Sequence, residues 1–196
     1  MSIVVEPLTG SALQEALPDL ARLRITVFRD WPYLYDGSLV YEEGYVEKFS
    51  QSPGAVIVAA RDGERIVGVA TASPMVGHAD AFAEPFRARG YDIAHICYFG
   101  ESVLLKEYRG RGIGHAFFDA RETHARSLPG TTHTAFCGVV RPDDHPQRPA
   151  DYIPLDAFWL KRGYLRMDGI VGSFEWLDIG DSAKTAKPMQ FWMKAL

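Results

Sequence analysis

Hydrophobic and polar positions along this chain follow two periods, and the changes between them divide the sequence into strands and helices. The clearest pair of β-rich runs spans residues 55–60 and 66–72, on either side of Arg61-Asp-Gly-Glu64, and predicts a hairpin. Five further runs predict strands at residues 3–6, 93–105, 132–140, 171–179 and 189–194. The longest of these is expected to carry a bulge near Gly100.

Apolar residues that recur three and four positions apart predict the helices. The first helix has an apolar face formed by Leu20, Leu23, Val27 and Phe28. Ser11 and Gln14 have the spacing of a capping box for this helix, and Pro18 is expected in its first turn. Further helices are expected over about residues 39–49, 79–90, from 113 to a stop at Leu128-Pro-Gly130, and 154–162.

This alternation of strands and helices, without internal repeats, predicts one α/β domain over residues 1–196. The net charge of −4 argues against a nucleic acid partner, and no apolar run approaches the length that spans a membrane. Cys97 and Cys137 are the two cysteines, which favours a reducing compartment, and we expect a cytoplasmic protein without a signal peptide. The six histidines lack the spacing of metal ligands, so no metal is expected.

The most informative segment is Tyr108-Arg-Gly-Arg-Gly-Ile-Gly114, which lies between a predicted strand and a predicted helix. Glycines that open a helix leave backbone N–H groups free to bind a phosphate at the positive end of the helix dipole. A dinucleotide fingerprint would need a third glycine where His115 stands, and a nucleoside triphosphate loop would need a Gly-Lys-Ser/Thr that the chain lacks. A tight glycine turn with surface arginines remains the alternative.

The Arg-x-x-Gly-x-Gly pattern of Arg109, Gly112 and Gly114 after a hydrophobic strand resembles the acetyl-CoA pyrophosphate loop of the GNAT-type N-acetyltransferase superfamily. The order of predicted elements resembles that superfamily over nearly the whole chain. The resemblance implies a single α/β (α+β) domain with a central twisted sheet of six to seven strands. That sheet is mixed and mostly antiparallel, has helices on both faces, and its central strands splay apart. It also implies an acetyl-CoA-dependent transfer to a primary amine by direct attack in a ternary complex.

The resemblance also implies where acetyl-CoA would bind. The backbone of Val103, Leu104 and Leu105 would pair with the pantetheine arm, and the phosphates would lie on the glycine loop. A short later helix would flank the cofactor on its other side. The implied cofactor-binding residues are Val103, Leu104, Leu105, Arg109, Gly110, Arg111, Gly112, Ile113, Gly114, Phe158 and Arg162.

Two residues are candidates for the chemistry. Glu101 lies in the strand before the loop, where relatives often carry a carboxylate, and it is expected to be the base or to orient the acceptor amine; a glutamate that faces solvent or pairs with an arginine is the alternative. Trp159 stands where many relatives have an acidic Tyr, so Tyr152 is proposed near the thioester, with packing as its alternative role. Cys137 lies in an apolar run and is expected to be an inert thiol rather than a nucleophile.

An aromatic segment near the N-terminus is the candidate acceptor region. Tyr33 and Tyr35 are expected to contact the acceptor, with the carboxylates of Asp36, Glu42 and Glu43 interleaved among the rings. Such a pocket suits a cationic amine, either a small molecule or a peptide, although the rings would equally serve packing or a homodimer contact. A catalytically silent acyl-CoA sensor and an acyltransferase that uses another acyl-CoA remain alternative functions.

Overall fold

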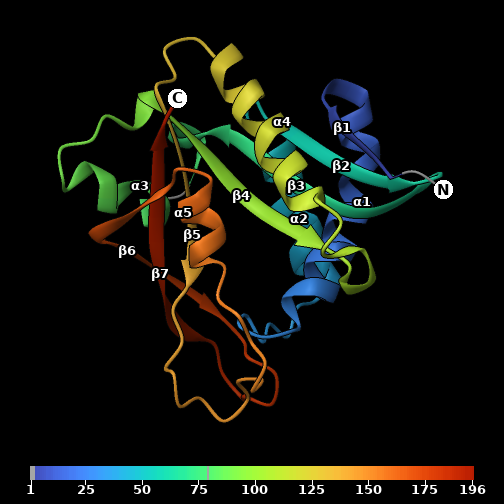
Figure 1. Cartoon of the computed structure of the whole chain (residues 1–196), viewed down its shortest axis with the longest axis vertical. Coiled ribbons are helices and arrows are strands. Elements are labelled where there is room, and N and C mark those ends of the chain that lie inside the picture. The colour runs from blue at the N-terminus through green and yellow to red at the C-terminus, as the bar shows by residue number, and fades with distance from the viewer. Residues whose placement is uncertain (1–2, 79) are drawn as a thin grey trace.

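The computed structural model describes the chain except residues 1, 2 and 79 (Figure 1). Its strands are β1 Val4–Leu8, β2 Val56–Asp62, β3 Arg65–Pro74, β4 Ile96–Leu104, β5 His133–Val139, β6 Leu165–Trp176 and β7 Thr185–Ala195. Its α-helices are α1 Gly10–Phe28, α2 Leu39–Ser50, α3 Asp80–Arg87, α4 Ile113–Ser127 and α5 Asp156–Lys161. Short 3₁₀ turns are η1 Met75–Gly77, η2 Ile93–His95 and η3 Lys106–Tyr108.

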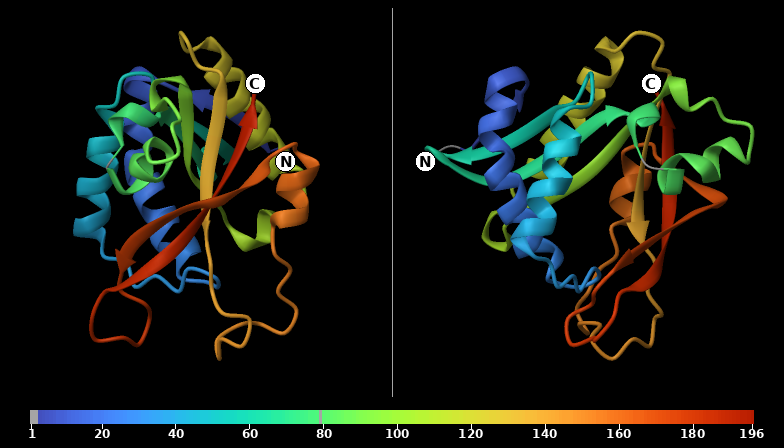
Figure 2. Two further views of the ribbon diagram at one scale, coloured as in Figure 1. Left: turned by 90° about the vertical axis from the view of Figure 1, so that its left-hand side faces the viewer. Right: turned by 180° about the vertical axis from the view of Figure 1, so that it is seen from behind.

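The seven strands form one sheet in the order β1-β2-β3-β4-β5-β7-β6. Every neighbouring pair is antiparallel except β4 and β5, which are parallel. Helices α4 and α5 cover one face of the sheet, and α1 and α2 cover the other, as the front and rear views show (Figure 1, Figure 2). The predicted fold class, a mixed and mostly antiparallel sheet between layers of helices, is therefore confirmed.

The two central strands separate after a short parallel ladder. Ile96–Tyr98 of β4 pair with residues 133–135 of β5, and the remainder of β4 pairs with β3 alone. Strand β5 pairs with β7 along its whole length, and beyond residue 135 it has no other strand partner, so β4 and β5 diverge like the arms of a fork (Figure 1). The predicted splay is confirmed, and it leaves one edge of each strand without a ladder partner.

A β-bulge lies in β4 just beyond the point where the fork opens. Between the pairs Ala70↔Ser102 and Ala72↔Phe99, β3 contributes one residue and β4 contributes two, Gly100 and Glu101. A bulge of this kind bends the strand and re-aims its side chains. A Cβ on Gly100 would lie 2.6 Å from Thr71 Oγ1, so this position requires glycine. The bulge predicted near Gly100 is confirmed.

Several predicted boundaries are wrong, and three of them are explained by a local backbone feature. Helix α1 begins after Thr9, which makes no side-chain cap, so Ser11 and Pro18 both lie inside the helix. Pro18 has no N–H to donate to the Gln14 carbonyl, and both residues are exposed, so water can reach that carbonyl. Strand β6 begins at Leu165 rather than residue 171, because a register shift that includes Gly169 with φ +73° interrupts its alternation of apolar and polar residues. Residues 93–95 form the turn η2 instead of extending β4.

Replacement of Gly100 by alanine tests whether the bulge must contain glycine. The new Cβ would displace Thr71, and we expect Gly100→Ala to lower the free energy of unfolding by about 1–3 kcal/mol. Gly44→Ala in α2 is the matched control, because its Cβ would meet no atom within 4 Å and alanine favours a helix by about 0.8 kcal/mol. Urea unfolding of both variants measures the difference. Equal stabilities of Gly100→Ala and the wild type would contradict this description of the bulge.

Candidate active site

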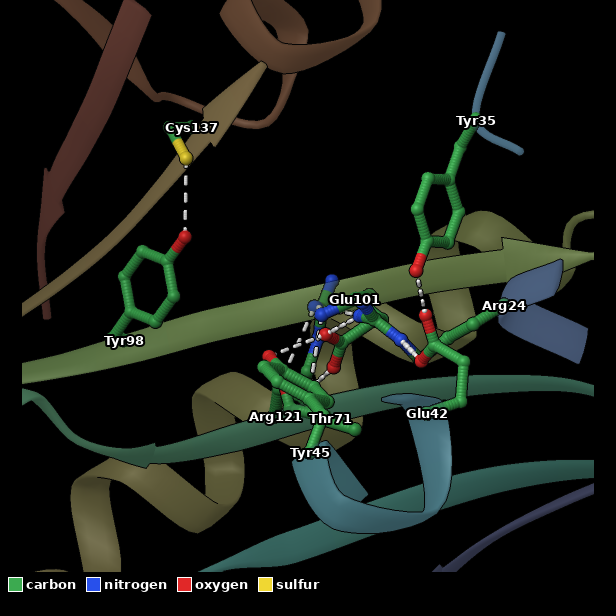
Figure 3. Close-up of polar contacts among 9 residues, drawn as sticks. All are labelled: Arg24, Tyr35, Glu42, Tyr45, Thr71, Tyr98, Glu101, Arg121 and Cys137. Atoms are coloured by element: carbon green, nitrogen blue, oxygen red, sulfur yellow. Dashed lines mark hydrogen bonds and ion pairs between the residues drawn. The ribbon is translucent and has the colours of Figure 1, made fainter. Parts of the chain in front are cut away.

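The carboxylate of Glu101 lies at the opening of the fork and is held from three elements (Figure 3). The Tyr45 hydroxyl of α2 donates to it at 2.7 Å, and the Thr71 hydroxyl of β3 donates at 2.6 Å. Arg24 of α1 forms an ion pair with the same carboxylate. Glu101 is only 4% exposed, so the expectation of a solvent-facing glutamate is wrong, and that of an arginine partner is correct.

Arg24 joins Glu101 to a second buried carboxylate, that of Glu42 in α2. The ring of Tyr45 lies beneath the guanidinium, 4.1 Å from its carbon to the ring centre. Glu42 in turn accepts a 2.7 Å hydrogen bond from the Tyr35 hydroxyl. Tyr35, Glu42, Arg24 and Glu101 thus form a continuous polar chain from the loop after α1 to the bulge (Figure 3).

This surrounding keeps Glu101 ionised. Burial alone would raise the pKa of its carboxyl, but the charge of Arg24 and the hydrogen bonds from Thr71 and Tyr45 hold that pKa below its usual range. Arg24 stays charged for the reciprocal reason, because the nearby carboxylates raise its pKa against the effect of burial. A carboxylate in this setting is a fixed negative charge rather than a group that titrates near neutral pH.

A second buried arginine supports the bulge from the opposite face of the sheet. Arg121 of α4 is 1% exposed and donates to the backbone carbonyl of Glu101 at 3.2 Å. Its guanidinium lies over the rings of Phe99 and Phe118, and burial lowers its pKa to about 10. The bulge is therefore held by an arginine on each face.

The sequence analysis did not single out either arginine, although a signal was present. Arg24 stands four residues after Leu20 and four before Phe28, within the apolar face of the first helix. Arg121 stands four residues after Phe117, in the corresponding stripe of α4. A charged residue inside an apolar stripe has to find partners in the core, because an unpaired buried charge is costly.

The glycine loop forms an open cradle at the start of α4. Gly112 precedes the helix with φ +80°, a conformation that favours glycine, and a Cβ added there would meet no protein atom within 4 Å. No side chain caps the first-turn amide groups at Ile113 and Gly114. Arg109 reaches back to the Leu104 carbonyl at 3.2 Å, and Arg111 to the Glu107 carbonyl at 2.9 Å, and both side chains are exposed. The loop has the shape and the free donors that a phosphate group needs.

The side chains of residues 103–105, just before the loop, pack in the core. Val103 and Leu105 are buried, and Leu104 is half-buried. The Leu105 amide donates to the Val67 carbonyl of β3 at 3.1 Å. Because neighbouring residues of a strand direct their backbone groups to opposite edges, those of Leu104 point toward the fork.

The two predicted residues of α5 lie against α4. Phe158 packs beside the loop, where a Cβ on Gly114 would lie 3.6 Å from its ring, and it also contacts Phe118. Arg162 forms ion pairs with Asp119 at 2.6 Å and Glu122 at 3.2 Å. Arg162 therefore joins α5 to α4, and its guanidinium already has carboxylate partners.

The strap, residues 29–38 between α1 and α2, lies beside the loops 140–155 and 177–184 (Figure 2). Arg141 donates to the carbonyls of Pro32 and Tyr33 at 2.8 and 2.7 Å and forms a two-bond ion pair with Asp178. The ring of Trp31 contacts the rings of His145 and Tyr152. The strap is thus fixed to both loops.

The comparisons with known proteins agree with this geometry. The sequence profile described as "Acetyltransferase (GNAT) family" matches residues 20–150. The chain belongs to this acetyltransferase family. No curated protein matches it in sequence.

Solved structures of other GNAT proteins share its fold. NAA60 of Arabidopsis thaliana with acetyl-CoA aligns at a TM-score of 0.61 and 15% identity, over 100% of this chain and 99% of that one. A ribosomal-protein-alanine N-acetyltransferase from Brucella melitensis gives 0.62 and 15%, over 98% and 99%. The aminoglycoside acetyltransferase AAC(6')-Ib with coenzyme A gives 0.58 and 15%, over 99% and 95%. At these identities the likeness establishes the fold alone.

Trp159 differs from the GNAT pattern, and Cys137 was considered as a nucleophile. The contacts of both residues indicate a role in packing. Trp159, at the usual Tyr position, packs its ring against Gly138 and Trp192. The Cys137 thiol is 3.1 Å from the Tyr98 hydroxyl across the opening of the fork, and burial raises its pKa to about 12. A thiol with that pKa is not a nucleophile at neutral pH, in agreement with its expected inert role.

Two further findings concern only the described residues. Outside positions 1, 2 and 79, no group of three or more His, Cys, Asp and Glu side chains is arranged to hold a metal ion. Over the same ranges, no helix has the length and apolar content needed to cross a bilayer.

The pH dependence of stability tests the ionised state of Glu101. Its pKa in the folded protein is below the unfolded value of about 4.3, so the unfolded chain takes up the proton first as the pH falls. The stabilisation is complete above that value and is lost as the pH decreases through the folded pKa. We expect Glu101→Gln to flatten the decrease of unfolding free energy between pH 5 and pH 3, measured by urea titration.

An exposed carboxylate provides the control for this measurement. Glu64→Gln, in the turn between β2 and β3, should retain the wild-type slope. Parallel slopes for Glu101→Gln and the wild type would show that the Glu101 pKa is not depressed by folding.

Proposed function

We propose that this GNAT protein is an acetyl-CoA-dependent N-acetyltransferase that acts on a primary amine by direct attack in a ternary complex. The observation that carries the proposal is the juxtaposition of an open helix N-terminus at Gly112 with a fork whose opening contains the ionised Glu101. One end of this arrangement suits a pyrophosphate, and the other suits an amine.

The residues of the cradle fit coenzyme A. The first-turn amides at Ile113 and Gly114 would donate hydrogen bonds to phosphate oxygens, and the exposed Arg109 and Arg111 would add charge-assisted hydrogen bonds. The Leu104 N–H, which points toward the fork, would donate to a carbonyl of the pantetheine arm, and Arg109 already donates to the Leu104 carbonyl. Acetyl-CoA supplies the thioester carbonyl as the electrophile and a thiolate as the leaving group.

Glu101 has the properties of an orienting group. Its depressed pKa makes it a weak proton acceptor, whereas its fixed charge favours an approaching amine. We therefore propose that Glu101 orients the acceptor and that water takes the ammonium proton before attack. As the C–N bond forms and the C–S bond breaks, the attacking nitrogen loses one of its two protons, which neutralises the departing thiolate to give free coenzyme A.

Tyr152 keeps its proposed role as a donor near the leaving group. Burial is the main cause that raises the pKa of its phenol, so the hydroxyl is protonated at neutral pH. The cytoplasmic location also belongs to this proposal and is supported by the free thiols of Cys97 and Cys137.

Replacement of Gly112 tests the cradle. The backbone at φ +80° strains any other residue by about 1–2 kcal/mol, and an alanine Cβ would occupy the space meant for the phosphate. We expect Gly112→Ala to weaken acetyl-CoA binding at least tenfold in isothermal titration calorimetry. Gly63→Ala is the control, because it has φ +61° and equal free space in the hairpin turn but no cradle. Gly63→Ala should lose similar stability and bind acetyl-CoA like the wild type.

The outcome also decides between the alternative functions. Failure of the wild-type protein to bind acetyl-CoA would contradict the proposal. Tight binding without thiol release from any acyl-CoA would favour a silent sensor, which the tryptophan at position 159 also suits. Turnover confined to a longer acyl chain would identify a different acyltransferase.

A further inference from the structure

The carboxylates that made the strap region look suited to cations have other partners. Asp36 pairs with Arg29 on the surface at 3.1 Å, and Glu42 is occupied by Arg24 and Tyr35. Glu43 lines a groove on the outer side of α1 and α2. The expectation that these three carboxylates would line an acceptor pocket is therefore wrong.

The remaining buried carboxylates near the fork also have partners. Those of Glu101 and Glu42 share the guanidinium of Arg24, whereas Arg121 binds only the backbone carbonyl of Glu101. Asp178, beneath the strap, is bound by Arg141 and by Lys187 at 3.1 Å. The exposed carboxylates on the loop 140–155 stand in solvent, where an ion pair contributes little.

Aromatic side chains with unused polar atoms occupy the same region. The Tyr33 hydroxyl has no hydrogen-bond partner within residues 3–78 and 80–196, and the same holds for the Tyr152 hydroxyl. The indole N–H of Trp31 is buried without a partner among the described residues. The buried indole N–H is an exception to the rule that buried polar groups are paired, and the two hydroxyls are accessible to solvent, so all three groups are free to bind a ligand.

Tyr33 is connected to Arg24 of the site through Phe28, and Trp31 contacts Tyr152 on the loop 140–155. Tyr33 packs on Phe28 at 4.4 Å between ring centres, and the Arg24 guanidinium lies 5.3 Å from that Phe28 ring. Burial is the main cause that raises the pKa of the Tyr33 phenol, and Cys137 and Glu101 contribute to the rise. Trp31 and Tyr152 contact each other edge to face at 5.9 Å.

We infer that the acceptor is a primary amine carried on an aromatic, otherwise uncharged body. This inference rests on the proposed function and names its acceptor class. An aromatic body would pack edge to face on Trp31, Tyr33 and Tyr152, and the unpaired Trp31 N–H and Tyr33 hydroxyl would bind its neutral polar atoms. The single amine would meet Glu101.

A polycationic amine does not fit this surrounding. Each additional ammonium group would have to be desolvated beside aromatic rings with no unpaired buried carboxylate to receive it, among the described residues. Discrimination of this kind comes from the missing partners as much as from favourable contacts. The site should therefore prefer one amine group and reject several.

Tyramine, spermidine and a short alanine-initiated peptide are the probes. Thiol release from acetyl-CoA is measured with each amine, and calorimetry measures tyramine binding to the coenzyme A-saturated protein. We expect tyramine to be acetylated with kcat/KM at least tenfold above that of spermidine and of the peptide. Equal or higher kcat/KM for spermidine or the peptide would overturn the inference, and so would no turnover of tyramine by protein that binds acetyl-CoA.

Single-atom variants connect the preference to the named rings. Tyr33→Phe removes one hydroxyl, and loss of one hydrogen bond should raise the Kd of tyramine about fivefold while leaving that of acetyl-CoA unchanged. Tyr91→Phe is the control, since its ring packs on Phe86 beside α3. If Tyr33→Phe binds tyramine like the wild type, the Tyr33 hydroxyl does not contact the acceptor, which contradicts this part of the inference.

The two proposals fail in different ways. Loss of acetyl-CoA binding by the wild-type protein contradicts the acetyltransferase function itself. Normal acetyl-CoA binding with turnover of spermidine or the peptide, but not tyramine, contradicts only the acceptor class.

Discussion

The buried ion pair between Arg24 and Glu101 is the interaction on which the site depends. Glu101 enters the interior because the bulge in β4 adds one residue, and Arg24 reaches it from α1. A carboxylate without this partner would be neutral or would destabilise the core by several kcal/mol. The bulge, helix α1 and the charge of Glu101 therefore depend on one another, and the loss of one would disrupt the other two.

Arginines on both faces explain why the sheet opens at this point. Arg121 takes up the backbone carbonyl of Glu101, and Thr71 uses its hydroxyl both to donate to the carboxylate and to accept from the Glu101 amide at 2.9 Å. The amide, carbonyl and carboxylate of Glu101 are thus satisfied without β5. Beyond residue 135, β5 pairs with β7 alone, so the two strands can diverge, and each keeps one edge free toward the fork.

The sequence predicted features that rest on local chemistry. The hairpin around Gly63, the glycine at the start of α4 and the bulge at Gly100 all follow from residues near one another in the chain. It did not predict the partners of Glu101, because Arg24 lies 77 residues away and Thr71 lies 30 residues away. The start of β6 was predicted wrongly for a different reason, because Gly169 interrupts the alternation of apolar and polar residues that identifies a strand.

The carboxylates of the candidate acceptor region were misread because a sequence shows which charges are near one another but not which are already paired. Asp36, Glu42 and Glu43 lie among aromatic residues in the sequence, yet each side chain faces a different partner or surface. Arg141, which fixes the strap from a distant loop, gave no local signal. Balanced charge pairs of this kind become visible only once the tertiary structure brings their members together.

The cofactor half and the acceptor half of the site therefore differ in how much their sequence can change between relatives. Phosphate binding relies on backbone amides and on glycine at one φ value, which side-chain replacement elsewhere leaves intact. This explains why a fold at 15% identity can retain a cradle like that at Gly112. Acceptor binding relies on the side chains of Trp31, Tyr33 and Tyr152, which the same divergence changes freely. An acceptor must for that reason be argued from this chain's own residues rather than transferred from its structural neighbours.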